Sequence, residues 1–233
     1  MDAPRYSLPP SLPAGTAHPP RQPDLGHALG MIVLYFALQV AIGMLAGLLL
    51  GFALGVVHHG APMRDIWGAM ASANTRSALV VIVLVGDAAI TLWLARRFWP
   101  QLWTQAQPPG FGFTVPAVAW CAAAAVVGLS MPWIGGQLTE LLARGHAVPQ
   151  DVKQLGDDAG LGFRIALTLV VASIGPVVEE LLFRGVLLSA LLRHLRVVPA
   201  ALASAALFAL VHLPDLHWQW YALPNLALLG VAL

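Results

Sequence analysis

Long apolar runs separated by short polar segments dominate the pattern of this chain. About twenty consecutive apolar residues are needed to span a bilayer as a helix, and four runs reach that length, at residues 29–57, 77–99, 114–135 and 163–192. Two shorter runs follow, at residues 198–213 and 221–233. The pattern predicts an all-α fold, a polytopic transmembrane helical bundle with about six spans, of which the last is apparently truncated.

Composition divides the chain into three parts. Residues 1–24 contain seven prolines and few aliphatic residues, which is typical of a disordered or extended tail. Residues 25–160 hold the first three spans and a polar connection, and residues 161–233 hold the remaining spans. Gly175 and Pro176 interrupt the over-long fourth run, where proline is expected to kink the helix.

The charge content supports a membrane protein and excludes some partners. Only 10% of the residues are charged, whereas soluble domains contain about a quarter. The net charge is +1 and no basic stripe is present, so we expect a lipid bilayer around the chain and no nucleic-acid partner. Basic residues between the runs slightly favour a cytoplasmic N-terminus by the positive-inside rule.

Three charged residues, Glu179, Glu180 and Arg184, lie in the middle of the fourth apolar run. A charged group at this depth costs about 2.5–3.5 kcal/mol on insertion scales, so such residues face the protein interior and usually carry function. Glu180 and Arg184 are four residues apart and can pair on one helix face. Glu179 is rotated by about 100° from Glu180, which favours Glu179 as the base and Glu180 as a supporting residue.

His212 is expected at the same depth as Glu179. In an antiparallel hairpin that turns near Arg196, Glu179 lies seventeen residues before the turn and His212 sixteen after it. A carboxylate and an imidazole that meet in this way can activate water or share a metal ion. The alternatives are a structural polar lock for the acidic pair and a helix-capping or interface role for His212.

Other intramembrane protease chemistries fit this sequence less well. No GxSxG nucleophile turn is present, and His212 is followed by Leu213 and Pro214 rather than completing an HExxH pair. An aspartyl protease needs two aspartates that share a proton. Asp87 is the only aspartate within an apolar run, and we interpret it as an interhelical hydrogen-bonding residue.

The segments GPVVEELLFRG and LFALVH resemble the first two motifs of a known family. This is the CAAX-protease and bacteriocin-processing (CPBP, Abi) family of intramembrane proteases, which includes the eukaryotic Ras-converting enzymes. Its pattern is EExxxR followed by FxxxH, and this chain supplies the matching side chains: Glu179, Glu180, Arg184, Phe208 and His212.

The resemblance implies a glutamate-dependent metalloendopeptidase in a bacterial inner membrane. The substrate would be a membrane-anchored peptide or protein C-terminus. Glu179 and His212 would activate water and would bind a divalent metal such as zinc, while Arg184 would brace Glu180.

One motif of that family has no counterpart here. The family carries a later HxxxN or HxxxD motif, but His217 is followed by Tyr221 at the fourth position and by Asn225 at the eighth. We expect the missing motif to fall beyond Leu233, in which case the chain is a fragment. The alternative is that the motif is absent and the chain is a degenerate, inactive member. The alternative function is therefore a non-catalytic bacteriocin-immunity or partner-binding protein of the same family.

Overall fold

A computed structural model describes residues 22–60, 62–104, 111, 115–146, 151–214 and 216–232. Within these residues all regular secondary structure is helical, so the predicted all-α fold is confirmed. Four helices are long and apolar enough to cross a membrane: α1 (Leu25–Val57), α3 (Ala73–Phe98), α4 (Val118–Ala143) and a composite helix, Leu161–Leu191. The chain is an integral membrane protein. Most of the tail predicted for residues 1–24 lies outside the described residues.

The remaining helices are short. α9 (Val197–Val211) and α10 (Leu223–Ala232) correspond to the two shorter runs of the sequence. The 3₁₀ turn η4 (Trp220–Ala222) lies between α9 and α10. The others connect the long helices: α2 (Met63–Ala71), α5 (Asp151–Asp158) and the 3₁₀ turn η1 (Pro100–Trp103).

α4 extends further than the hydrophobic pattern predicts. The third run was expected to end at residue 135, followed by a polar connection, but the helix continues to Ala143. The prediction was wrong here because the added turns still bury one face: Thr139 and Ala143, four residues apart, are both buried.

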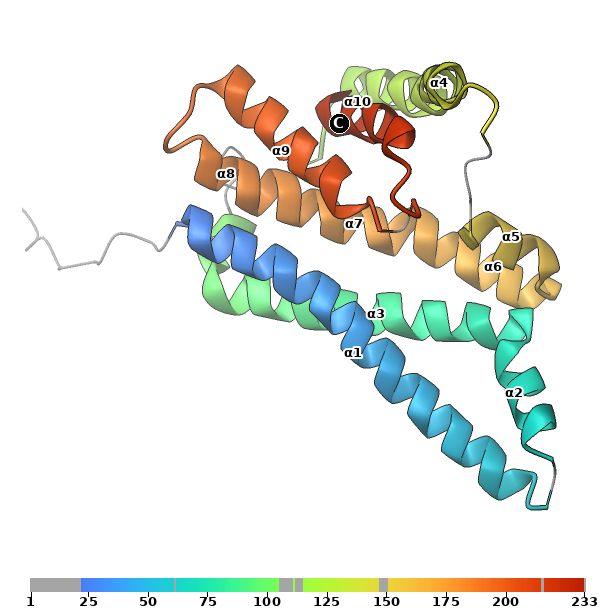
Figure 1. The fold of residues 1–233 in the computed structure, drawn as a ribbon. Coiled ribbons are helices and arrows are strands. Elements are labelled where there is room, and N and C mark those ends of the chain that lie inside the picture. The colour runs from blue at the N-terminus through green and yellow to red at the C-terminus, as the bar shows by residue number, and fades with distance from the viewer. Residues whose placement is uncertain are drawn as a thin grey trace, which may run out of the picture.

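The composite helix contains two π-helical segments. It is built from α6 (Leu161–Leu169), η2 (Val170–Ile174), α7 (Gly175–Glu180), η3 (Leu181–Leu187) and α8 (Leu188–Leu191). Gly175 is the residue directly before Pro176, and its N–H donates to the carbonyl of Val170, five residues earlier. The disturbance expected at Gly175 and Pro176 thus takes the form of a π-bulge, and the helix continues through it (Figure 1).

The composite helix lies between two groups of helices. Figure 1 shows α1 and α3 on one side of it and α9, α10 and α4 on the other. α9 packs on η3 and α8, while α10 packs between α9 and α4. The hydrophobic core is centred on η3 and includes Leu182, Phe183, Val186 and Leu187. The acidic residues of α7 therefore sit immediately beside the best-packed part of the bundle.

Two contacts fix α9 against η3. Ser204 is buried, and its hydroxyl donates to the carbonyl of Phe183 at 2.8 Å. The rings of Phe183 and Phe208 meet edge to face with centroids 5.2 Å apart. These contacts set the register of α9 along the composite helix. They therefore also set the depth of His212, the residue that follows the last turn of α9.

Candidate active site

The structure brings Glu179 and His212 together. Glu179 lies on α7, and His212 is the residue that caps the C-terminal end of α9. The Nε2 atom of His212 is 3.6 Å from Oε1 of Glu179, and the two side chains are 18% and 22% exposed. The juxtaposition expected from their equal distances to the turn is present.

Hydrogen bonding sets the orientation of the His212 ring. Nδ1 lies 2.7 Å from the carbonyl oxygen of Phe208. Because a carbonyl only accepts, Nδ1 carries the proton, and Nε2 of the neutral ring is an acceptor that faces Glu179. The rings of Phe208 and Phe36 flank the imidazole, with centroid distances of 4.7 and 6.3 Å.

Phe36 comes from α1 and was not identified from the sequence. The local sequence of an apolar helix does not indicate which of its faces will contact a histidine that is more than 170 residues later in the chain. The contact between α1 and η3 brings it there.

The two facing atoms are too far apart for a direct hydrogen bond. Their separation of 3.6 Å is longer than a hydrogen bond between nitrogen and oxygen. When the His212 ring is neutral, both atoms are acceptors, and a water molecule beside them can donate one hydrogen to each.

Arg184 holds the second carboxylate and reaches a further helix. Its guanidinium pairs with Glu180 and also donates to the carbonyl oxygen of Gly230 on α10 at 2.8 Å. The Arg184 side chain is 17% exposed, but that of Glu180 is 45% exposed. The ion pair expected from the spacing is formed, and it is buried on the arginine side only.

The described residues do not fit the metal centre that the resemblance implies. A catalytic zinc usually has three protein ligands and a water. Glu179 and His212 supply two donors, and Glu180 is engaged by Arg184. Within the described part of the chain, no three histidine, cysteine, aspartate or glutamate side chains lie close enough to share a metal.

Asp87 does not contribute to this site. It is fully buried in α3. The Thr91 hydroxyl of the same helix donates to its Oδ1 at 3.2 Å, and Oδ2 makes no hydrogen bond to any described group. The interhelical role interpreted from the sequence therefore stays a prediction.

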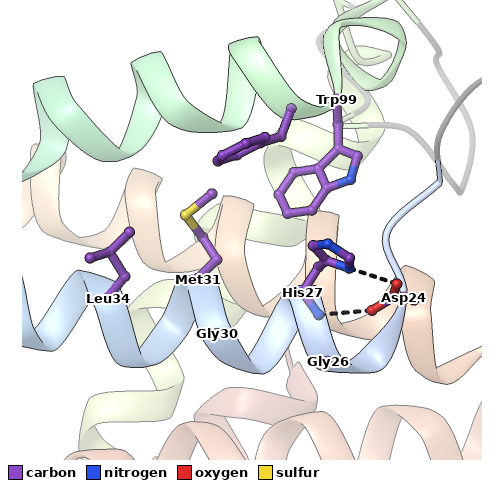
Figure 2. A pocket seen from close by; sticks show the side chains of 8 residues that line it. Asp24, Gly26, His27, Gly30, Met31, Leu34 and Trp99 are labelled. Carbon is purple, nitrogen blue, oxygen red and sulfur yellow. Dashed lines mark hydrogen bonds and ion pairs between the residues drawn. The ribbon is translucent and has the colours of Figure 1, made fainter.

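A separate cavity of about 430 Å³ opens at the N-terminal end of α1 (Figure 2). The side chains of Asp24 and His27 are hydrogen-bonded at its rim, with 2.6 Å between Oδ2 and Nδ1, and Trp99, the C-cap of α3, also lines it. Leu34 lines this cavity, whereas Phe36 contacts the ring of His212. Those two residues are separated by about 200° around α1, so the cavity opens away from Glu179.

Comparison with known proteins supports the family suggested by the two motifs. Residues 161–233 match the family described as type II CAAX prenyl endopeptidase Rce1-like. This segment contains the EExxxR and FxxxH residues, and the resemblance is thereby confirmed over it. No curated protein and no solved structure matches the chain.

Proposed function

We propose that this chain is an intramembrane endopeptidase that cleaves membrane-anchored peptides or protein C-termini, since residues 161–233 match the family described as type II CAAX prenyl endopeptidase Rce1-like. The observation that carries the proposal is the 3.6 Å approach of His212 Nε2 to Glu179 Oε1 within a bundle of membrane-spanning helices. A carboxylate and an oriented imidazole at this depth supply what water needs to attack an amide.

The proposed reaction begins with a water held by both side chains. Glu179 takes a proton from the water as its oxygen attacks the scissile carbonyl carbon. The second O–H of the water donates a hydrogen bond to Nε2 of His212, whose Nδ1–H is held by the Phe208 carbonyl, and this hydrogen stays on the attacking oxygen. The proton on Glu179 then passes to the amide nitrogen, the C–N bond breaks, and a carboxylic acid and an amine are released.

Arg184 is proposed to be a positioning residue. Its bonds to Glu180 and to the Gly230 carbonyl connect α7 with α10. With Glu180 engaged in this way, Glu179 is the carboxylate left to act as base.

The proposed location is a bacterial inner membrane with a cytoplasmic N-terminus. Figure 1 shows the start of α1, the end of α3 and the α8–α9 turn at one end of the bundle, and Arg193 donates to the Pro23 carbonyl there at 3.2 Å. Four arginines and one aspartate lie at this end: Arg96, Arg97, Arg193, Arg196 and Asp24. This excess of positive charge supports a cytoplasmic position.

Cleavage of a membrane-anchored reporter peptide tests the proposal. The full chain in liposomes is expected to cleave the peptide, and Glu179→Gln is expected to abolish cleavage while leaving the fold intact. Asp158→Asn, which removes an exposed carboxylate outside this site, serves as the matched control.

Full activity of Glu179→Gln would contradict the mechanism. Absence of cleavage by the unaltered chain would favour the rival function, a non-catalytic bacteriocin-immunity or partner-binding member of the family. The incomplete set of metal donors among the described residues is the observation on which that rival rests.

A further inference from the structure

A second polar cavity of about 610 Å³ lies between α4, α10 and the loop that follows His212. Four polar side chains line it among apolar walls, namely Thr139, Glu140, His146 and Asn225. The two motifs of the family do not include any of these residues, and the proposed reaction does not use them.

The chain reverses at the end of α4 to build one wall. Arg144 and Gly145 both adopt left-handed backbone conformations, with φ of 48° and 86°. This turn folds His146 back, so that its Nδ1 lies 2.7 Å from the carbonyl oxygen of Ala143. Nδ1 must therefore donate, and Nε2 of the neutral ring is an acceptor.

A glycine makes room for the opposite wall. A Cβ atom at Gly135 of α4 would overlap the side chain of Asn225 on α10, so Asn225 keeps its observed position only because residue 135 has no side chain. Gly136, the next residue, also lines the cavity, but a Cβ there would meet nothing within 4 Å. The Asn225 side chain thus depends on glycine at one position of α4.

Two polar groups of the cavity lack a partner among the described residues. Thr139 is 8% exposed, yet its Oγ1 makes no hydrogen bond to any described group. Glu140 forms no ion pair within the described residues. Arg144, four residues further, would pair with it on a continuous helix, but the helix ends at Ala143.

These groups select a positively charged ligand. A carboxylate, a hydroxyl oxygen and an imidazole acceptor can all receive hydrogen bonds from an ammonium or guanidinium group. The carboxylate repels phosphate, so the cavity disfavours an anionic lipid headgroup.

The cavity is adjacent to the candidate active site. The Leu216 N–H donates to the carbonyl of His212 at 3.2 Å, and Leu216 lines the cavity. On α10, Leu226 lines the cavity and Gly230, one turn further, accepts from Arg184. A peptide substrate held at Glu179 can therefore place a neighbouring side chain in the cavity.

We propose that this cavity binds a lysine or arginine side chain of the peptide substrate, at a position near the scissile bond. The inference rests on the proposed function. Glu140 supplies the charge that recognises the side chain, and His146, Thr139 and Asn225 supply hydrogen bonds around it.

Binding to a catalytically silent protein tests the inference independently of cleavage. The probe is a lipid-anchored peptide series, presented to the Glu179→Gln protein in nanodiscs of neutral lipid, with lysine or norleucine at successive positions. We expect lysine at one position to tighten binding about tenfold over norleucine. Glu140→Gln should remove this preference, Thr139→Val should weaken it about threefold, and Asp158→Asn should leave it unchanged.

Equal affinity for the lysine and norleucine peptides at every position would overturn the inference. A lysine preference that survives Glu140→Gln would overturn it as well. If the preference follows Glu140 but the unaltered chain does not cleave, the binding site stands and the proposed function fails. If the chain cleaves without any lysine preference, the function stands and the cavity has been misassigned.

Discussion

Nε2 of His212, at the end of α9, faces Oε1 of Glu179 on α7 at 3.6 Å. Since one water bridges the two atoms in the proposed reaction, the side chains act as a unit. Positioned acid–base groups contribute about 10²- to 10⁴-fold to rate, so Glu179→Gln and His212→Ala are each expected to lower cleavage by at least about 10²-fold. The double variant should be little slower than either single variant.

The measurement is single-turnover cleavage of the anchored reporter by the four proteins. Independent roles would multiply the two losses, and that outcome would contradict a shared water. Phe36→Leu is a useful companion variant, because it removes only a ring that flanks the imidazole. Its effect should be much smaller than that of His212→Ala.

Loss of Arg184 should destabilise the fold and not merely slow the reaction. Its side chain makes charge-assisted hydrogen bonds to Glu180 and to the Gly230 carbonyl, and bonds of this kind contribute about 1.5–3 kcal/mol each. We expect Arg184→Ala to lower the thermal unfolding midpoint and the yield of folded protein in detergent. Arg97→Ala, at an exposed position near the end of α3, is the control. Wild-type stability in Arg184→Ala would show that the contact to α10 has no structural role.

Adjacent glycines on α4 should respond differently to the same substitution. A Cβ at Gly135 would overlap the Asn225 side chain, whereas a Cβ at Gly136 meets open space. Overpacking of this kind costs about 1–3 kcal/mol, while alanine in place of an unconstrained helical glycine stabilises by about 0.4–1 kcal/mol. We expect the thermal unfolding midpoint of Gly135→Ala to lie below that of the unaltered protein. The midpoint of Gly136→Ala should be equal to it or higher. The reverse order would mean that α10 does not pack on α4 as described.

Regular helix geometry explains why the Glu179–His212 pair could be predicted. Two helices joined by a short turn advance by the same rise per residue, so counting from the turn fixes relative depth. The pairing of Glu180 with Arg184 is likewise local, because it depends only on a spacing of four.

Contacts between helices distant in sequence could not be predicted in the same way. Arg184 reaches Gly230 because α10 lies over α9, and the sequence does not indicate which helices are neighbours. The partial exposure of the Glu180 side chain could not be predicted for the same reason, since burial depends on which helices pack around α7. The length of α4 was missed because the buried pair Thr139 and Ala143 is too sparse to stand out as an apolar run.

The start of α1 provides a prediction about pH that lies outside the membrane. Asp24 is the N-cap, and its carboxylate accepts the His27 backbone N–H at 2.8 Å. That hydrogen bond, followed by the bond to the His27 side chain, lowers the pKa of Asp24 below its usual value of 3.8. A lowered pKa means that the cap stabilises the helix start fully above pH 3.8 and is lost as the pH falls through the value in the folded protein.

Hydrogen exchange of the His27 amide, corrected for its intrinsic rate, should therefore be slow at pH 5 and should quicken as the pH falls below 3.8. Asp24→Asn keeps a capping side chain that does not titrate, so its protection should not change over the same range. An unaltered protein that behaves like Asp24→Asn would show that the carboxylate does not cap α1.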